Sequence, residues 1–350
     1  MTERNAELDY ARAIGIVLVV FGHALRGLQG AGYVPEDGSG SGWAFATDYL
    51  IYTFHMPLFL IISGALFAPE KFAGARSLLG KLAVLIVWPY LLWSVVQGAV
   101  LVLMARFGAV NSTDADWSWI LQIGWVPLGQ FWFLYALFAA QVLAFFAYKR
   151  VPVWAMAAIT LTAFLVLAQG GEEVPVLVSY GCFYFALGMV ARKLDLIARL
   201  PATWPGALAL LAAGSATAVA CLLFEVPAYL PIPAAIVMSA ATISVCKALK
   251  PVLAASSVGW WFAIIGQCSM GIYVLHILAI GAVRLAMTRF MGITDPALLL
   301  IGITLFATLV PVAVQLVALR LGIAKWVGMP CSARPFTATG SQTGAAAPAS

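Results

Sequence analysis

Apolar residues occur along this chain in runs of roughly 20, separated by short polar segments. A run of that length crosses a bilayer as a helix, and the runs lack the alternation of a membrane β-strand. The pattern therefore predicts an all-α, polytopic membrane protein. We expect about ten membrane-spanning helices, at residues 9–27, 46–68, 82–104, 129–148, 152–169, 175–191, 205–224, 230–247, 259–284 and 297–320.

The charged residues between these runs give an independent test of the topology. When the N-terminus is placed in the cytoplasm, most of the 19 basic residues fall in cytoplasmic segments and most of the 14 acidic residues fall on the outer side. This asymmetry is what the positive-inside rule describes. We therefore expect a multi-pass protein of a bacterial inner membrane, with both termini in the cytoplasm.

The composition narrows the class of protein further. Apolar residues make up 63% of the chain and charged residues 9%, whereas a soluble domain contains about 25% charged residues. The net charge of +5 follows from the topology, and no block of Lys and Arg is dense enough to bind nucleic acid. We expect one transmembrane domain over residues 1–330 and a disordered cytoplasmic tail over residues 331–350.

Each of the 3 histidines, His23, His55 and His276, lies in an apolar run. Arg12 precedes His23 by eleven positions, a separation of about 16 Å along one helix. Ionisable side chains at membrane depth are costly, and they therefore mark functional sites. All three imidazoles are predicted to lie between the middle of the membrane and its outer third, with His276 nearer the outer end of its span. They either share a buried reaction chamber or each satisfy a separate partner inside the helix bundle.

A series of short motifs occurs in order along the chain: Arg12-x10-His23, FHMPLFLIISGALF at residues 54–67, Pro89-Tyr90, Trp132-Phe133-Leu134 and Ser269-x3-Tyr273-x2-His276. Together they resemble the integral-membrane acyltransferase family three, and within it the fucose 4-O-acetylase-like branch of sugar O-acetyltransferases. The resemblance implies transfer of an acyl group, often acetyl from acetyl-CoA, to a carbohydrate hydroxyl. It also implies that Arg12 and His23 are catalytic residues, because the family's Arg-x10-His signature matches these two positions.

The loop after the second span departs from the family pattern. Many relatives carry an Arg-x-x-Arg motif there, whereas this chain has Lys71, Arg76 and Lys81. Arginine binds phosphate as a bidentate fork, and lysine binds it as a point charge. We expect these three residues, together with Arg12, to contact the phosphates of CoA with a geometry that differs from that of the family.

The same residues suit the chemistry of acyl transfer. A sugar hydroxyl becomes a good nucleophile when a base of near-neutral pKa removes its proton, and histidine is the natural base. His23 is the expected general base. Arg12, at the cytosolic mouth, either attracts the phosphates of CoA or is an interfacial anchor beside Asp9. Asp48, near the depth of His23, either orients the imidazole ring or is a solvated loop acid.

Further residues are candidates for support or substrate contact. His55 is followed by a Met-Pro pair, and the kink that proline causes suits either a cavity wall or helix packing alone. Ser269, Tyr273 and His276 share one helix face. This polar stripe is either a substrate contact or a structural hydrogen-bond ladder. Trp132, which belongs to the family motifs, is a further candidate for substrate binding.

These observations favour one function over two alternatives. We expect a membrane O-acetyltransferase that moves acetyl from cytosolic acetyl-CoA to a hydroxyl of an exopolysaccharide, a lipid-linked glycan or another surface glycan, without a metal. Transfer is either direct or passes through an acetylated histidine or serine. A secondary transporter or glycan exporter with a histidine proton relay would need acids inside the spans. Apart from Asp9 and Asp48, which are near span ends, no acidic residue lies inside a predicted span. A scaffold subunit gives no reason to bury histidines at similar depth.

Overall fold

The computed structural model describes residues 5–35, 42–106, 116–254 and 256–331. The tail predicted for residues 331–350 therefore lies outside the described residues, apart from Cys331. Within the described ranges the chain is helical and has no strand. The α-helices are α1 Ala6–Gln29, α2 Gly42–Leu66, α3 Ala75–Leu82, α4 Trp88–Arg106, α5 Ser118–Gln122, α6 Trp132–Ala147, α7 Val153–Leu167, α8 Glu173–Lys193, α9 Leu196–Arg199, α10 Trp204–Leu223, α11 Ile232–Ala254, α12 Ser257–Gln267, α13 Ser269–Leu285 and α14 Pro296–Arg320.

Short helical segments of other kinds extend or join these helices. Two are 3₁₀ turns, η1 Pro69–Lys71 and η3 Gly129–Phe131, and two are π-helical, η2 Ala83–Val87 and η4 Ala286–Phe290. The π segment η2 joins α3 to α4, so that one continuous span covers Ala75–Ala105.

The prediction of an all-α polytopic membrane protein is confirmed. In the described part of the chain, 9 helical segments are long and apolar enough to cross a membrane. A further predicted span, residues 152–169, corresponds to α7, which has 15 residues. Its length of about 22 Å is shorter than the hydrocarbon core of a bilayer, about 30 Å.

The predicted ninth span, residues 259–284, is wrong at its start. The chain bends at Cys268 between α12 and α13, and the spanning segment is Ser269–Phe290. The cause is a tertiary contact: a Cβ on Gly266 would lie 1.9 Å from the carbonyl oxygen of Asp9, so α12 packs closely on α1. As a result, His276 lies near the middle of its span instead of in the outer half.

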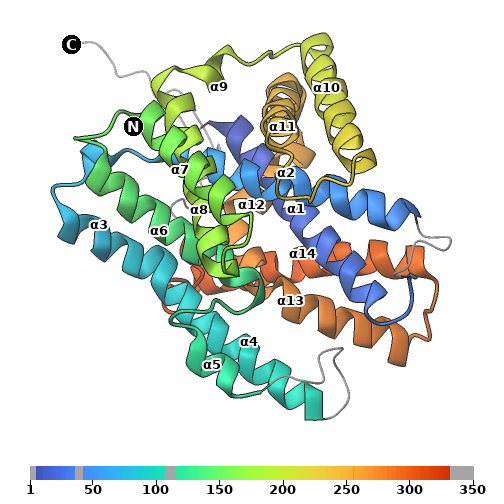
Figure 1. The fold of residues 1–350 in the computed structure, drawn as a ribbon. Helices are drawn as coiled ribbons and strands as arrows, with labels where there is room; N and C mark the ends of the chain where they lie inside the picture. The colour runs from blue at the N-terminus through green and yellow to red at the C-terminus, as the bar shows by residue number, and fades with distance from the viewer. Residues whose placement is uncertain (1–4, 36–41, 107–115, 255, 332–350) are drawn as a thin grey trace, which may run out of the picture.

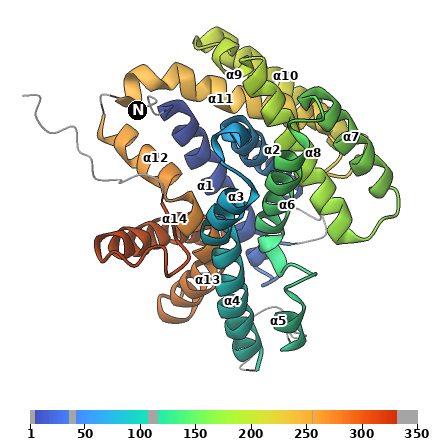
Figure 2. The same ribbon diagram turned by 90° about the vertical axis from the view of Figure 1, so that its left-hand side faces the viewer.

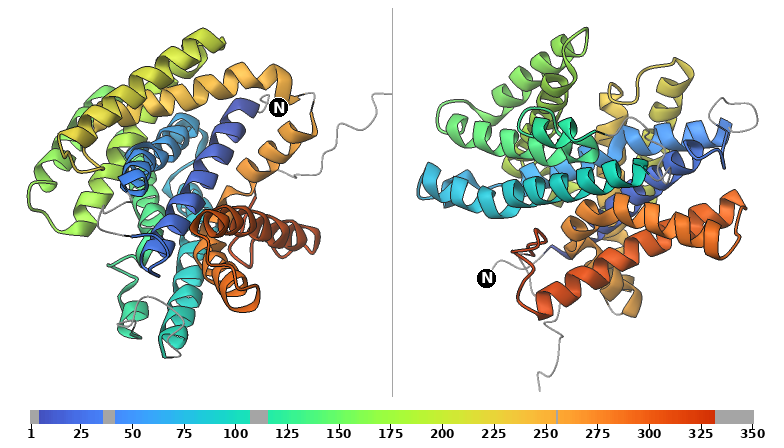
Figure 3. Two further views of the ribbon diagram at one scale, coloured as in Figure 1. Left: turned by 90° about the vertical axis from the view of Figure 1, so that its right-hand side faces the viewer. Right: turned by 90° about the horizontal axis from the view of Figure 1, so that it is seen from below.

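Helices α1 and α2 run through the centre of the molecule (Figure 1), between α12 on one side and α6 and α8 on the other (Figure 2). Helices α13 and α14 lie side by side along one edge (Figure 3). The centre is packed through glycines: a Cβ on Gly64 would lie 1.9 Å from the carbonyl oxygen of Phe185, and one on Gly188 would lie 2.1 Å from that of Ile61. Small residues of this kind let membrane helices approach closely, and they hold α2 against α8.

Segments predicted to be cytoplasmic contact one another at one end of the bundle. Lys250 Nζ lies 3.0 Å from Glu7 Oε2, which joins the end of α11 to the start of α1. Lys247 Nζ donates to the carbonyl oxygen of Leu200 at 2.6 Å, next to the short helix α9. Arg192 donates to the carbonyl oxygen of Phe67 at 2.7 Å. These contacts fit the predicted alternation of loops.

Segments predicted to be on the outer side likewise gather at the opposite end. Arg26 and Asp48 form an ion pair between α1 and α2. Tyr49 donates from its hydroxyl to the carbonyl oxygen of Val226 at 2.6 Å, and Arg284 donates to that of Gly27 at 3.3 Å. The loops thus separate into two groups as the charge pattern predicts.

The ion pair of Arg192 with Glu70, in the loop after α2, makes a small contribution that depends on pH. The Arg192 hydrogen bond lowers the pKa of the Glu70 carboxyl below its ordinary value of 4.5. A lowered pKa stabilises the fold above the unfolded-state pKa, and this stabilisation is lost as the pH falls through the folded-state pKa. Both side chains are largely exposed, at 39% and 53%, so the contribution is below about 1 kcal/mol.

We therefore expect Glu70→Gln to lower the melting temperature slightly at pH 7, and we expect the difference to shrink as the pH falls toward about 3, because protonation of the carboxyl removes the ion pair. The measurement is the melting temperature of both proteins in detergent at the two pH values. An equal difference in melting temperature at the two pH values would show that the ionised Glu70 carboxylate does not stabilise the fold.

Candidate active site

One face of α1 carries a line of side chains along most of the helix. Arg12, Ile16, Val19, His23 and Arg26 follow one another at intervals of four and three residues, which places them on the same side of a helix. This face turns toward α2 and α13, and a pocket lies at each end of it.

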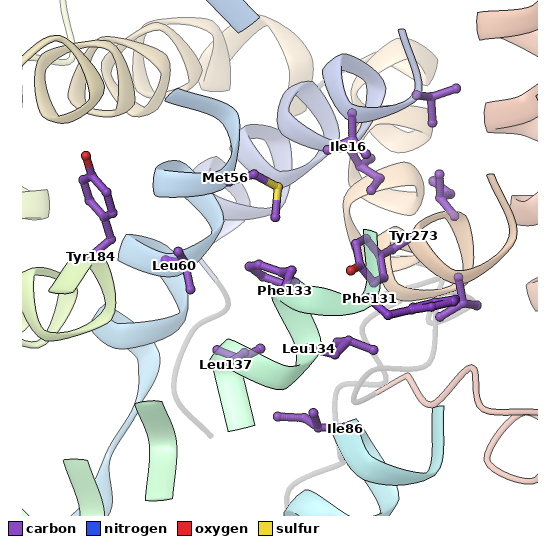
Figure 4. Close-up of a cluster of buried hydrophobic side chains, with 14 of the residues drawn as sticks. Ile16, Met56, Leu60, Ile86, Phe131, Phe133, Leu134, Leu137, Tyr184 and Tyr273 are labelled. Atoms are coloured by element: carbon purple, nitrogen blue, oxygen red, sulfur yellow. The ribbon is translucent and has the colours of Figure 1, made fainter. Parts of the chain in front are cut away.

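The first pocket, which we name the Arg12 pocket, has a volume of about 230 Å³. Figure 4 shows Ile16, Met56, Phe133 and Tyr273 pointing from four helices toward this space. Its lining is Arg12, Ile16, Val19, Met56, Phe59, Ser63, Phe133, Leu134, Leu137, Gly266, Gln267, Ser269, Met270, Tyr273, Pro330 and Cys331. Because Arg12 and Cys331 share this lining, the start of α1 and the segment after α14 lie at the same end of the molecule.

The second pocket, the Arg26 pocket, has a volume of about 500 Å³ and is rich in aromatic rings. Its lining is Arg26, Tyr52, Met56, Trp132, Phe164, Ala168, Gly170, Gly171, Glu173, Val176, Leu177, Tyr180, Ala228 and Tyr229. Met56 belongs to both linings. The two pockets therefore approach each other at Met56, beside the stretch of α1 that carries His23.

The structure brings the three histidines together between the two pockets. The ring centroids of His23 and His276 are 5.0 Å apart. The Tyr52 ring lies edge-on to the other two ring neighbours in the cluster: its centroid is 6.1 Å from that of His23 and 4.7 Å from that of His55. His55 and His276 are buried, whereas His23 is partly buried. Imidazoles from α1, α2 and α13 thus form one cluster, which we name the histidine cluster.

Backbone carbonyls fix the neutral tautomer of two of these imidazoles. His55 Nδ1 lies 2.6 Å from the carbonyl oxygen of Ile51, and His276 Nδ1 lies 2.7 Å from that of Tyr273. A carbonyl oxygen only accepts hydrogen bonds, so each Nδ1 carries a proton, and in the neutral form of each ring Nε2 carries the free lone pair. His276 Nε2 is buried and has no hydrogen-bond partner among the described residues. The cluster therefore holds proton-accepting nitrogen atoms inside the protein.

Tyr52 is a member of this site that the sequence reasoning missed. The Arg26 guanidinium carbon lies 3.3 Å from the centroid of the Tyr52 ring, and the ring packs on Gly22, where a Cβ would come within 2.9 Å of it. The Tyr52 hydroxyl is buried without a hydrogen-bond partner in the described part of the chain. The signal was present in the sequence, because Tyr52, Met56, Phe59 and Ser63 repeat on α2 the spacing of the α1 face.

Asp48 forms an ion pair with Arg26. Its contacts therefore differ from the first role predicted for it, which was to orient the His23 ring. The Asp48 carboxylate accepts hydrogen bonds from Arg26 Nε and Nη2, both at 2.8 Å. This bidentate geometry is the strongest that the two groups form. Asp48 therefore holds the Arg26 guanidinium over the Tyr52 ring, and its partner is Arg26 instead of the His23 imidazole.

The predicted stripe on α13 is divided between two surroundings. Ser269 and Tyr273 line the Arg12 pocket, whereas His276 faces His23. The Tyr273 hydroxyl donates to the backbone carbonyl of Gln130. Trp132 lines the other pocket, with its ring centroid 5.9 Å from that of Tyr180. Ser269, Tyr273 and Trp132 therefore each line one of the two pockets, whereas His276 lines neither and belongs to the histidine cluster.

The basic residues predicted to contact CoA lie in different places. Arg12 lines the pocket that bears its name, and its Nη1 lies 3.2 Å from Asp9 Oδ1. Lys71, Arg76 and Lys81 are exposed and are not part of that lining. Lys71 ends the 3₁₀ turn η1, whereas Arg76 and Lys81 belong to α3, and Lys81 Nζ lies 5.2 Å from the centroid of the Phe72 ring.

Over the described ranges, no group of three or more His, Cys, Asp and Glu side chains is arranged to hold a metal ion. The chemistry available is that of neutral imidazoles, a tyrosine hydroxyl and two guanidinium groups, one at each pocket. Such groups bind anions and transfer protons.

Two curated proteins are similar to part of this chain. Nodulation protein NolL of Mesorhizobium japonicum is 27% identical over 164 residues, which are 44% of this chain and 39% of that protein. Nodulation protein NolL of Sinorhizobium fredii is 29% identical over 192 residues, 53% of this chain and 48% of that protein. The chain thus spans less than half the length of the curated relatives it matches. No solved structure matches it.

The family comparison covers far more of the chain. Residues 5–316 match the family described as an acyltransferase domain. The match begins just before α1 and ends inside α14, so it includes the histidine cluster, Arg12 and the linings of both pockets up to Tyr273. This multi-pass membrane protein therefore belongs to the acyltransferase domain family.

Proposed function

We propose that this chain is a membrane O-acetyltransferase that moves acetyl from acetyl-CoA to a hydroxyl of a saccharide. One observation carries the proposal: a single face of α1 places Arg12 at one pocket, Arg26 at a second pocket and His23 between them. A donor and an acceptor that enter from opposite ends of the bundle would meet at the histidine cluster. Membership of the acyltransferase family and the resemblance to sugar O-acetyltransferases support the same reaction.

The Arg12 pocket suits the donor. A guanidinium at its mouth offers a bidentate partner to the phosphates of CoA. Along α1, Arg12 and His23 are separated by about 16 Å, a distance comparable with an extended pantetheine arm. The lining between them is apolar, with Ile16, Val19 and Met56 facing the space. The thioester would therefore reach the cluster while the nucleotide remains at the predicted cytoplasmic side.

The Arg26 pocket suits a saccharide. Its aromatic rings offer flat faces to the C–H surface of a sugar, and the polar groups among them can bind hydroxyls. Arg26 is a donor, Glu173 an acceptor and the Tyr52 hydroxyl a donor without a partner in the described residues. The pocket lies at the predicted outer end of the bundle, so the acceptor would enter from that side.

In the direct form of the reaction, His23 is the general base. The saccharide oxygen attacks the carbonyl carbon of the thioester while a neutral imidazole nitrogen of His23 accepts the hydroxyl proton. The carbon–sulfur bond then breaks, and the sulfur of CoA takes this proton from the imidazolium. The products are an acetyl ester and the free thiol, and His23 is neutral again. His276, with its ring 5.0 Å away, stands beside the base.

The experiment that tests this function uses the purified protein in lipid nanodiscs with radiolabelled acetyl-CoA. The acceptors are water and a panel of methyl glycosides that includes methyl fucoside. We expect release of the CoA thiol and label on at least one glycoside. A transporter or exporter would release no thiol and label no sugar, and that result would rule the proposal out.

We expect Tyr52→Phe to weaken binding of the saccharide. The substitution keeps the ring against Arg26 and the histidines, and it removes only the hydroxyl. Loss of one hydrogen bond raises the KM for the saccharide about 3- to 10-fold, with the KM for acetyl-CoA unchanged. Tyr10→Phe, at a buried position on α1 outside both pockets, is the matched control. Equal kinetics for the two variants would show that the Tyr52 hydroxyl does not contact the saccharide.

A further inference from the structure

A third cavity, the Arg284 groove, lies outside the site described above and plays no part in the proposed reaction. It has a volume of about 680 Å³ and lies between α4, α13 and the end of α1. Its lining is Gly30, Ala31, Tyr33, Val100, Leu101, Met104, Ile277, Leu278, Gly281, Ala282, Arg284, Leu285, Thr288 and Arg289. Gly281 and the side chains of Ala282 and Leu285 are exposed on a membrane-spanning segment, so the groove opens toward the membrane.

The groove changes from apolar to basic along α13. Ile277 and Leu278, near the middle of the span, form its inner part, and Leu101 of α4 faces them. Arg284, Thr288 and Arg289 form the part nearer the end of the span. This order, with apolar residues at depth and cationic residues at the interface, is the order of a lipid whose headgroup is an anion.

The two arginines are exceptions to the charge pattern of the chain. Most of the basic residues belong to the predicted cytoplasmic side, whereas Arg284 and Arg289 belong to the predicted outer side. Both line the same groove, where they bring two positive charges next to an apolar channel. Arginine matches phosphate oxygens in a bidentate geometry, so the charges are complementary to one or more phosphates.

The groove lies at the same end of α1 as the Arg26 pocket, although the two linings share no residue. Arg284 Nη1 donates to the carbonyl oxygen of Gly27 at 3.3 Å, and the residue before Gly27 is Arg26. On its inner side the groove begins at Ile277, the residue after His276. A headgroup held at Arg284 would therefore lie at the same end of α1 as the pocket proposed for the saccharide.

We infer that the Arg284 groove binds the phosphates and lipid chain of a polyisoprenoid diphosphate that carries the acceptor saccharide. The inference rests on the proposed function and names the class of its acceptor. The lipid chain occupies the apolar part of the groove, the phosphates bind Arg284 and Arg289, and the sugar extends over the end of α1 to the Arg26 pocket. Two arginines favour a diphosphate over the single phosphate of most membrane phospholipids.

Two variants probe the groove without touching the histidine cluster. Arg289→Gln removes one charge at an exposed position. Gly281→Leu places a side chain in the groove, where a Cβ meets nothing within 4 Å, and it replaces a poor helix former by a good one. Arg150→Gln, an exposed arginine in the turn after α6, is the matched control.

The experiment measures binding of undecaprenyl diphosphate to the full chain in detergent by native mass spectrometry. We expect Arg289→Gln and Gly281→Leu each to weaken binding at least about 10-fold, and Arg150→Gln to leave it unchanged. Undecaprenol, which lacks phosphate, should bind weakly to every variant. Equal binding of undecaprenyl diphosphate by all variants, or equal binding of phosphatidylglycerol by the unmodified protein, would overturn the inference.

The outcome is independent of the test of the proposed function. Hydrolysis of acetyl-CoA by water needs no lipid, so it should be the same in Arg289→Gln, Gly281→Leu and the unmodified protein. Loss of lipid binding with hydrolysis retained supports the groove as an acceptor site. If the variants keep both hydrolysis and lipid binding, the groove is not the lipid site, and the proposed function is unaffected. If the unmodified protein releases no CoA thiol, the proposed function itself is wrong.

Discussion

Replacement of His23 by glutamine is expected to lower the rate of acetyl transfer by about 10²- to 10⁴-fold, the usual contribution of a general base. Glutamine keeps a polar side chain of similar reach and loses the proton-accepting nitrogen. The residue stands beside His276 and Tyr52, between the two pockets. The measurement is kcat for thiol release with a methyl glycoside that the unmodified protein acetylates.

The control for this experiment is His276→Gln, because its ring is the nearest imidazole to His23. If His23 is the base, the His276 variant should lose less activity than the His23 variant. The binding of labelled acetyl-CoA should be unchanged in the His23 variant, since Arg12 and the lining of its pocket are intact. A folded His23→Gln protein that keeps its rate, or a greater loss in His276→Gln, would show that the base is misassigned.

The second large effect is expected at the other end of the α1 face. Arg12→Gln should raise the KM for acetyl-CoA about 10- to 100-fold, because a charged hydrogen bond to phosphate contributes about 1.5–3 kcal/mol. The value of kcat at saturating donor should change little, because the histidine cluster is distant by about 16 Å along the helix. The measurement is the KM for acetyl-CoA in the same assay.

A shortened donor makes this prediction specific. S-acetylpantetheine has the thioester and the arm and lacks the nucleotide phosphates, so its KM should be the same in Arg12→Gln and in the unmodified protein. Arg76→Gln is the matched control, because Arg76 is exposed and lies outside the lining of the Arg12 pocket. If the two variants raise the KM for acetyl-CoA equally, the phosphates bind at the loop after α2 as the family pattern implies. An equal effect of Arg12→Gln on both donors would exclude a phosphate contact.

The hydrophobic pattern predicted the spans well because burial in lipid is a property of local composition. Helices α1, α2 and α14 begin and end close to the predicted boundaries, and the charges between spans predicted which loops gather at each end. The ninth span was misplaced because its start depends on a distant contact. Gly266 lies against the backbone of Asp9, and the pattern of apolar residues at 259–268 does not predict that contact.

The candidate site divides in the same way. The three histidines and Arg12 were found from the sequence, because an ionisable residue in an apolar run stands out. Tyr52 did not stand out by residue type, because tyrosine is common in membrane helices, and its only sequence signal was the spacing that it shares with Met56, Phe59 and Ser63. The partner of Asp48 could not be predicted either. The packing of α1 against α2 decides whether the Asp48 carboxylate lies near the Arg26 guanidinium or near the His23 imidazole.

The sequence by itself determined that this chain is a multi-pass helical membrane protein, and it singled out the few ionisable side chains inside the apolar runs as candidates for its chemistry. Both follow from the cost of placing charges and polar groups in lipid, which is fixed residue by residue. Only the tertiary structure decided that His23, His55 and His276 meet, that Arg12 and Arg26 face different pockets, and that Arg284 and Arg289 line a third. The physical reason is that these relations depend on how helices far apart in the chain pack, and packing is not a local property.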